Sequence, residues 1–153
     1  MADYLKQAGL ADRGLVIGYD TRFASEDFAA AVAEVIAGNG IKVYLGIRTT
    51  PTPVISFGVL AQQAGGAVII TASHNPAIWN GFKYKDEHGS SAPDEVTAQI
   101  EEYIARNLRN GKVSRLPLPE ASAQGLVADI DLTPVYLKQI AKLVDLEKLR
   151  RAA

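Results

Sequence analysis

The stretch AVIITASHNPAIWNGFKY, residues 67–84, begins as an apolar run and then changes into small and polar residues. A short apolar run that follows two glycines is typical of a strand buried on both faces of a sheet. Ser73 and His74 come directly after the run, an Asn-Pro pair and a W-N-G turn follow, and Lys83 stands between two aromatic residues. The stretch therefore predicts a buried strand, a tight polar loop and a short return strand at residues 81–85.

Two more apolar runs predict strands like the one at the start of this stretch. They lie at residues 15–19 (LVIGY) and 41–47 (IKVYLGI). Continuous apolar runs, in place of strands that alternate apolar and polar residues, are typical of a parallel sheet covered on both faces. Because helical segments separate the runs, we predict an α/β fold, a three-layer α/β/α sandwich with a mixed, mostly parallel sheet.

Helices are predicted between these strands and after them. One covers residues 26–37 and ends at the glycines of G-N-G. Thr52 can cap a second helix that has Pro53 at its first position, and a third begins near Pro93. The residues expected to face inward are Phe28, Val32, Val35 and Ile36 in the first helix and Val96, Ile100, Ile104 and Leu108 in the third.

The two ends of the chain fit this core less well. A helix starts almost at Met1, without a capping residue before it, and its inward face is expected to hold Tyr4, Leu5 and Ala8. Residues 109–125 contain two prolines and no periodicity, which predicts a linker. A last helix opens at Thr133, and its expected inward residues are Leu137, Ile140 and Val144. We expect one domain over residues 1–128 and the start of a neighbouring unit over 129–153.

Composition restricts the classes of protein that this chain can belong to. The 153 residues carry 16 basic and 17 acidic side chains, a net charge of -1, so we predict no nucleic-acid partner. The absence of cysteine excludes disulfides and thiolate metal sites. Since there is no apolar run near the roughly 20 residues of a membrane span and no apolar signal-peptide core at the start, we predict no membrane partner and a cytoplasmic location.

Two polar clusters follow predicted strands and are expected at the same edge of the sheet. Asp20, Thr21 and Arg22 follow the first strand, and residues 71–76 (TASHNP) follow the third. In open α/β sheets, ligands bind beyond the carboxyl ends of the strands. Arginine is a bidentate phosphate ligand, and a serine hydroxyl can be a nucleophile or a phosphate carrier. The clusters predict an anion or phosphate site.

Plainer interpretations of the same residues stay open at this point. Arg22 and Lys83 can be ordinary surface charges, and the Asn-Pro pair can be only a turn. His74 can donate a hydrogen bond or move a proton near neutral pH, but neighbouring side chains on an extended loop point apart. We therefore expect no direct contact between Ser73 and His74.

The full string TASHNPAIWNGFKY is more specific than its parts and resembles the phosphoserine loop of the α-D-phosphohexomutase family, the phosphoglucomutases and phosphomannomutases. The string GYDTR resembles the G-x-D-x-R strand end of that family, and TTPTP resembles its T-P helix start. The resemblance covers about residues 1–128. The T-A-S-H-N-P wording is more similar to gluco- and mannomutases than to glucosamine mutases, which tend to have S-A-S-H-N-P.

The resemblance implies a role for several residues. Ser73 matches the serine that carries the transferable phosphate, and Mg²⁺ would bind an oxygen of that phosphate. His74 matches a histidine that contacts the reacting group, Lys83 a general acid or base, and Arg22 an arginine near the phosphoserine. The residues implied in substrate or phosphate binding are Thr71, Asn75 and Asn80.

The implied activity is that of an intramolecular phosphotransferase, a phosphohexomutase. Phosphate would move between C1 and C6 of a hexose phosphate through a bisphosphate intermediate, with glucose 1,6-bisphosphate as activator. The choice between glucose and mannose stays open, because the loop that reads the sugar in the family has no counterpart here.

This chain departs from the family pattern in ways that affect the expected activity. The F-G-T-S-G-x-R-G segment before the first helix and the D-x-D-x-D-R metal loop of the second domain do not occur in it. We therefore expect residues 1–128 to be domain I without its first strand, and residues 129–153 to be a linker and the lead-in helix of a truncated domain II. The chain alone is expected to be largely inactive, with domains II–IV as partners.

Two other functions are compatible with a serine on such a loop, and a second copy of the chain is a further predicted partner. A non-catalytic module that binds phosphate or sugar phosphate is the alternative to the mutase. A serine hydrolase would need a G-x-S-x-G elbow, and neither glycine is present around Ser73. Without the first strand, a sheet edge or part of the core is expected to be exposed, so self-association through that surface is also predicted.

Overall fold

The computed structural model describes residues 1–111 and 113–152. The described residues contain one five-stranded sheet in the order β4-β3-β1-β2-β5, in which β4 runs antiparallel to β3 and the other pairs are parallel. The strands are β1 (Leu15–Tyr19), β2 (Val43–Gly46), β3 (Ala67–Ile70), β4 (Phe82–Lys85) and β5 (Val127–Ile130). The prediction of a mixed, mostly parallel sheet is confirmed.

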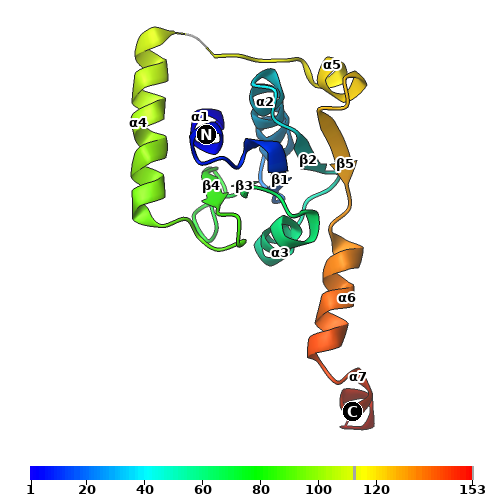
Figure 1. Ribbon diagram of the computed structural model, residues 1–153. Helices are drawn as coiled ribbons and strands as arrows, with labels where there is room; N and C mark the ends of the chain where they lie inside the picture. Colours follow the sequence, from blue (N-terminus) through cyan, green and yellow to red (C-terminus); the bar gives the residue numbers. More distant parts are fainter. Residues whose placement is uncertain (112, 153) are drawn as a thin grey trace.

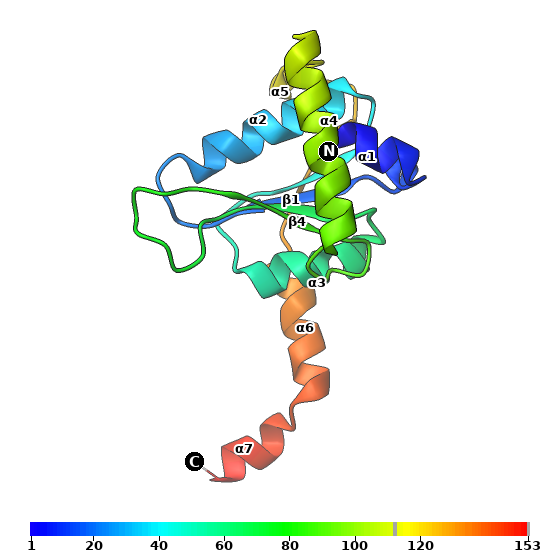
Figure 2. The same ribbon diagram turned by 90° about the vertical axis from the view of Figure 1, so that its left-hand side faces the viewer.

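Helices cover both faces of the sheet (Figure 1, Figure 2). The helices of the described residues are α1 (Ala2–Gln7), α2 (Ser25–Gly38), α3 (Thr52–Gln62), α4 (Asp94–Asn110), α5 (Leu118–Ala123), α6 (Thr133–Leu143) and α7 (Leu146–Ala152), with a short 3-10 turn η1 (Ala11–Arg13). Residues of α1, α2, α4 and α5 pack into the core on one face, and α3 packs on the other. The three-layer α/β/α sandwich is therefore also confirmed.

The central strand β1 divides the core between the two layers. Leu15 and Ile17 are fully buried on the face of α2, and Val16 is fully buried on the face of α3. Successive side chains of a strand point to opposite faces, so a strand covered on both sides must be apolar at every position. This explains why the strand reads as a continuous apolar run.

The prediction of a linker over residues 109–125, of which Lys112 lies outside the described residues, is wrong for residues 118–123. Helix α5 lies within it, and Glu34 of α2 anchors it by accepting a hydrogen bond from the backbone N–H of Leu118 at 2.9 Å. The strand β5, which follows, pairs with β2 at the edge of the sheet. Because β5 is half-buried and contains an aspartate, it lacks the apolar run that marks the inner strands. The predicted domain boundary after residue 128 falls inside β5 and stays a prediction.

The apolar face of α2 is only partly covered. Ala29, Ala33 and Ile36 are buried against the sheet, but Phe28 is 50% exposed, so the prediction that it faces inward is wrong. Beside α2 lies a hollow of about 770 Å³, and its apolar lining includes Met1, Phe28, Val32, Val35, Ile70 and Phe82. This is a surface of the kind predicted to drive self-association, which stays a prediction.

The outer helices bury less than their periodicity predicted. Of the predicted face of α4, Ile100 is buried, whereas Ile104 and Leu108 are exposed. Asn107 ties this helix to α1 by donating a hydrogen bond of 2.8 Å to Asp3. Amphipathic spacing indicates that a helix has an apolar side. It does not indicate whether the rest of the chain covers that side along its whole length.

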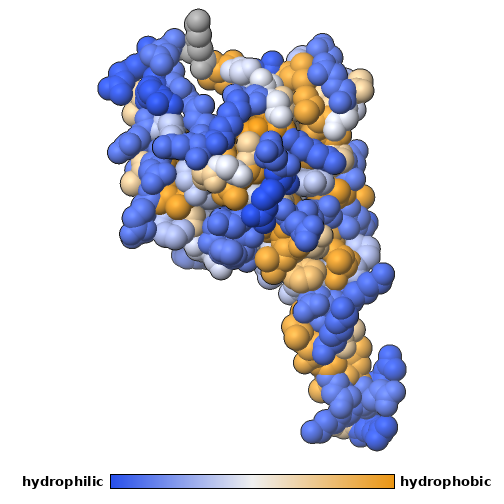
Figure 3. Space-filling view, in the orientation of Figure 1, coloured by the Kyte–Doolittle hydropathy of each residue, from blue (hydrophilic) through white to orange (hydrophobic). Residues whose placement is uncertain are grey.

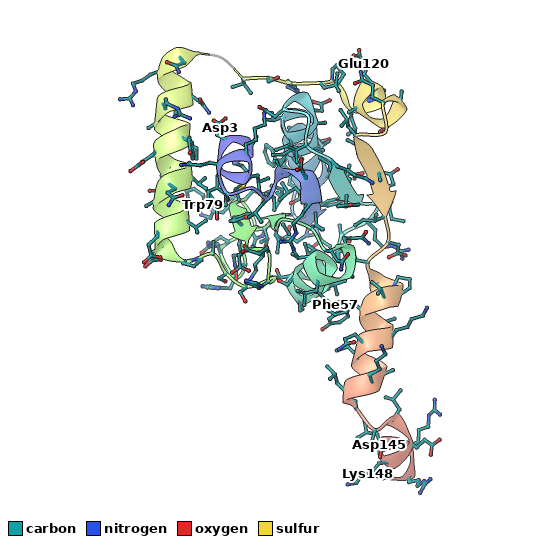
Figure 4. The ribbon with its side chains drawn as sticks, in the orientation of Figure 1. Asp3, Phe57, Trp79, Glu120, Asp145 and Lys148 are labelled. Atoms are coloured by element: carbon teal, nitrogen blue, oxygen red, sulfur yellow. The ribbon has the colours of Figure 1, made fainter. Side chains whose placement is uncertain are left out.

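Helix α6 has no buried residue, and with α7 it extends away from the sheet (Figure 1). Leu137 is exposed, against the prediction, and apolar side chains continue along this part of the surface (Figure 3). One contact with the domain is an edge-to-face pair between Tyr136 and Phe57 of α3, with ring centroids 6.0 Å apart; Figure 4 labels Phe57 near the start of α6. At the start of α3 the capping residue is Pro51, where Thr52 was predicted. Within the described residues, no helix is both long and apolar enough to cross a membrane.

Candidate functional site

Two loops meet at the carboxyl edge of the sheet. The loop of residues 71–81 follows β3, and residues 20–24 follow β1; because these strands are parallel neighbours, both loops project from the same edge (Figure 2). The base of the longer loop is closed by a hydrogen bond of 2.9 Å from the N–H of Thr71 to the carbonyl of Gly81. A Cβ at Gly81 would lie 2.8 Å from the carbonyl oxygen of Thr71, so the close approach requires glycine.

Ser73 is exposed on the loop and adopts a left-handed backbone conformation, with a φ of 54°. Its N–H donates a hydrogen bond of 3.0 Å to Oγ1 of Thr71. Residues other than glycine are uncommon in this conformation, and it persists when surrounding contacts hold it. The loop therefore presents the Ser73 hydroxyl to solvent from a constrained backbone.

The side chains of Ser73 and His74 lie close together. Oγ of Ser73 is 3.4 Å from Nδ1 of His74, at the long end of a hydrogen bond. The prediction that these side chains point apart is wrong, because it assumed an extended backbone, and Ser73 is left-handed. His74 is exposed, so its ring can also reach a molecule bound at this edge.

Arg22 reaches across from the shorter loop and binds the backbone of the longer one. Its guanidinium donates to four carbonyl oxygens at distances of 2.7–3.0 Å, those of Ser73, Asn75, Pro76 and Trp79. Its Nε lies 3.4 Å from a carboxylate oxygen of Asp20, and the side chain is 13% exposed. The longer loop is thus folded around this one guanidinium.

Asp20 holds the shorter loop; it belongs to the polar cluster predicted after the first strand, but the sequence assigned it no individual role. Its carboxylate accepts hydrogen bonds from the backbone N–H of Arg22 at 3.0 Å and from the hydroxyl of Ser25 at 3.1 Å. Partial burial raises the pKa of Asp20, but hydrogen bonds from the Thr71 side chain, Arg22 and Ser25, together with the Arg22 charge, outweigh it and hold the pKa below its ordinary value. The GYDTR string contains Asp20, so a signal existed, but the string does not reveal the hydrogen bonds that its carboxylate accepts.

Asn80 links the same loops from the other side. Its Nδ2 donates to the carbonyl of Phe23 at 3.2 Å and to Oγ of Ser25 at 3.0 Å, and its Oδ1 accepts from the N–H of Gly81 at 3.0 Å. Asn75, in contrast, is exposed, and its carbonyl accepts from Arg22. Asn80 was predicted to bind substrate or phosphate, but both polar atoms of its side chain already have partners within the protein.

Lys83 lies on β4 and pairs with Ile69 of β3. Side chains of a cross-strand pair point to the same face, so Lys83 is on the side of the sheet that α3 covers, where it is exposed. The chain brings Lys83 back to the carboxyl edge two residues after Gly81. The structure therefore groups Ser73, His74 and Arg22 by direct contacts and connects Lys83 to them through the backbone of the hairpin.

The described residues do not form a metal site on their own. Nowhere in residues 1–111 and 113–152 do three or more His, Asp or Glu side chains gather closely enough to hold an ion. Mg²⁺ prefers an octahedral shell of oxygen ligands. A phosphate on Ser73 would supply such oxygens, but the described residues contain no cluster of three or more His, Asp or Glu side chains to add to them.

The fold and the two loops together define an α/β/α domain that presents a serine at the carboxyl edge of its sheet. The chain belongs to the phosphoglucomutase/phosphomannomutase family, since residues 1–110 match the family model described as "Phosphoglucomutase/phosphomannomutase, alpha/beta/alpha domain I". The match contains every residue discussed above for the site.

Curated relatives and a solved structure agree with this assignment. The chain is 36% identical over 145 residues to a phosphoglucomutase of Staphylococcus epidermidis, covering 94% of this chain and 26% of the relative. It is 38% identical over 150 residues to a probable phosphomannomutase of Haemophilus influenzae, covering 94% and 29%. The crystal structure of a candidate phosphomannomutase from Thermus thermophilus superposes with a TM-score of 0.77 at 31% identity, covering 95% of this chain and 30% of that one.

These alignments also show how much of its relatives' length the chain covers. It spans about 26–30% of the length of these relatives, so it corresponds to one domain of a larger enzyme. The activity of the whole enzymes, and their substrates, are therefore a matter of proposal for this chain.

Proposed function

We propose that this chain is the serine-bearing domain of a phosphohexomutase, in which Ser73 carries the phosphate that moves between C1 and C6 of a hexose phosphate. Family membership supports the class of reaction. The observation that carries the proposal is the exposed hydroxyl of Ser73 on a left-handed backbone, which four carbonyl hydrogen bonds and the Thr71 hydroxyl hold in place. A serine in that position can accept a phosphate without displacing the core.

The half-reaction that loads the serine can be written with these residues. Ser73 Oγ attacks the phosphorus of a hexose bisphosphate, the new O–P bond forms, and the bond from phosphorus to the sugar oxygen breaks. The serine proton must leave, and His74 Nδ1, 3.4 Å from Oγ, is placed to accept it. Lys83 is the candidate donor of the proton that the sugar oxygen gains. Catalysis of such transfers rests on positioning and on stabilising spread negative charge.

The remaining polar residues have supporting roles in this proposal. The exposed side chain of Asn75 is free to face the phosphate, and Thr71 fixes the N–H of Ser73. Mg²⁺, when bound to the phosphoserine, supplies positive charge that offsets the charge of the phosphate. Its further ligands would come from domains II–IV, which we propose as the partners of this chain in the intact enzyme.

The test is the intact mass of the chain after incubation with glucose 1,6-bisphosphate, with and without Mg²⁺. We expect a gain of one phosphate, about 80 Da, in the wild-type chain and no gain in Ser73→Ala, because the hydroxyl is the phosphate acceptor. Ser122→Ala, at an exposed position on α5, is the matched control and is expected to load like the wild type.

Two outcomes would contradict the proposal. A gain of phosphate that persists in Ser73→Ala would show that another residue carries the phosphate. No loading of any variant, with binding of the bisphosphate unchanged by Ser73→Ala in calorimetry, would favour the alternative, a module that binds phosphate or sugar phosphate without chemistry. The observation that favours this second function is that the described residues contain no cluster of three or more His, Asp or Glu side chains that could hold a metal ion.

A further inference from the structure

Arg22 is the cation nearest to the serine in the described part of the chain, yet its donors already have partners inside the protein. A guanidinium has five N–H donors, and arginine binds a phosphate through two parallel ones. Here Nη1 donates to two carbonyls and Nη2 to two more, while Nε faces Asp20. An arginine that waits for an anion would have an exposed edge, and this side chain is 13% exposed.

The carbonyls that Arg22 binds are spaced along the loop that carries Ser73. They begin at Ser73 itself, at 2.8 Å, and continue to Trp79, at 3.0 Å. The loop backbone makes few hydrogen bonds of its own over this range, the turn from Asn75 N–H to the Ala72 carbonyl at 3.0 Å among them. The guanidinium therefore supplies much of the polar contact that gives these residues one conformation.

Ser73 depends on such support because of its backbone. A non-glycine residue at a φ of 54° is held there by its surroundings, and the carbonyl of Ser73 is one of the atoms that Arg22 binds. Asp20 in turn accepts a hydrogen bond from the backbone N–H of Arg22, and the Thr71 hydroxyl accepts one from the N–H of Ser73. The carbonyl of Ser73 is thus held by the shorter loop, and its N–H is held within the longer loop.

We infer that Arg22 is a positioning residue: it holds the backbone of residues 73–79 and thereby sets where Ser73 Oγ lies, and it does not bind the phosphate. The expected effect of Arg22 on the rate of Ser73 loading rests on the proposed function. Its effect on the conformation of residues 73–79 does not. It assigns to Arg22 a different role from that of an arginine in contact with phosphate, which is what the sequence alone suggests for a cation near the serine.

Lysine separates the two roles. It keeps the positive charge, so a phosphate contact would survive in part in Arg22→Lys. A single ammonium with three donors cannot reach four carbonyls spread along seven residues. We therefore expect Arg22→Lys and Arg22→Gln to slow the loading of Ser73 to a similar degree, by roughly tenfold to a hundredfold, as misplacement of a reacting atom does.

The experiment combines the rate of phosphate gain by intact mass with hydrogen exchange of the peptides that cover residues 71–81. Both Arg22 variants are expected to raise exchange in these peptides and to leave the exchange of β1 and β3 unchanged. Arg48→Lys is the matched control, since Arg48 is at the same sheet edge, pairs with Asp131 and is more exposed. It is expected to change neither readout.

The outcomes decide between the roles in each case. Loading near the wild-type rate in Arg22→Lys but not in Arg22→Gln would overturn the inference and restore a role for the charge. Unchanged exchange at residues 71–81 in both variants would overturn it as well. If the wild-type chain does not load at all, the proposed function fails, and the exchange measurement alone then confirms or overturns the positioning role of Arg22.

Discussion

At the scale of the residue, Asp20 is the side chain that holds the shorter loop of the site. Its carboxylate accepts hydrogen bonds from the backbone N–H of Arg22 and the hydroxyl of Ser25, and Nε of Arg22 lies 3.4 Å from it. These hydrogen bonds favour the ionised carboxylate, and that is the physical reason for its lowered pKa. A pKa that is lower in the folded chain than in the unfolded chain makes the free energy of unfolding depend on pH.

The sign of that dependence gives a prediction. The stability contributed by the Asp20 carboxylate is present above its unfolded pKa, near 4, and is lost as the pH falls through the lower folded value. Asp20→Asn is therefore expected to lower the free energy of unfolding by about 1–3 kcal/mol at pH 7, and this difference is expected to shrink below about pH 4. Urea unfolding at a series of pH values from about 7 down to about 3 measures it.

The control for this prediction is Asp12→Asn, at an exposed position in η1 at the opposite end of β1. It is expected to change the unfolding free energy little at any pH. A difference between wild type and Asp20→Asn that stays constant down to the acid end of the range would mean that the carboxylate charge does not contribute.

At the scale of the element, the site depends on how closely α3 packs against β1. Gly18 lies two residues before Asp20, and a Cβ at this position would lie 2.4 Å from Cδ1 of the fully buried Ile55. Ile55 belongs to the apolar cluster on the α3 face. Glycine at the end of the strand therefore lets the helix approach the sheet directly below the loop that carries Arg22.

Gly18→Ala is expected to destabilise the chain by about 1–3 kcal/mol, because the added methyl overpacks the interface between β1 and α3. Ile55→Val removes Cδ1, the nearest of the Ile55 atoms that the Gly18→Ala methyl would meet, and alone it is expected to cost about 0.5–1.5 kcal/mol. In the double variant we expect the two losses to be less than additive. Chemical unfolding of the four proteins of this cycle measures the coupling; strict additivity would show that the close approach has no energetic effect.

The elements show where prediction from sequence succeeds and where it stops. The inner strands were predictable, because a strand covered on both faces must be apolar at every position, as in residues 15–19. The edge strand β5 was not, since pairing with β2 along one side and half burial leave a mixed sequence. The residues predicted to face inward on α2 and α4 include exposed ones, because spacing alone does not show how far the partner surface extends.

At the scale of the whole molecule, the chain is one domain of an enzyme family whose members are more than three times as long. The surface of the chain has exposed apolar areas, as expected for one domain of a longer protein. An apolar hollow of about 770 Å³ lies beside α2. Helices α6 and α7 extend away from the sheet and carry exposed leucines, and Figure 3 shows apolar surface along α6. Exposed apolar surface of this extent is typical of contacts with other polypeptide.

We predict that the chain by itself does not turn over glucose 1-phosphate when given Mg²⁺ and a trace of glucose 1,6-bisphosphate. The described residues provide no acidic cluster to complete the metal shell, and loss of such charge stabilisation is expected to reduce the rate to below about a thousandth. A coupled assay for glucose 6-phosphate measures it, with the phosphoglucomutase of Staphylococcus epidermidis as the positive control. Turnover at a rate comparable to that control would contradict the prediction.

The sequence by itself determined the α/β class, the inner strands and the identity of the serine loop, since these depend on local patterns of apolar residues and on a contiguous string of letters. The tertiary structure alone decided what the polar residues do to one another. Arg22 binds carbonyls more than 50 residues away, and the left-handed backbone of Ser73 brings Oγ to His74. The physical reason is that backbone carbonyls are the same in every residue, so no sequence pattern marks which of them a distant guanidinium will find.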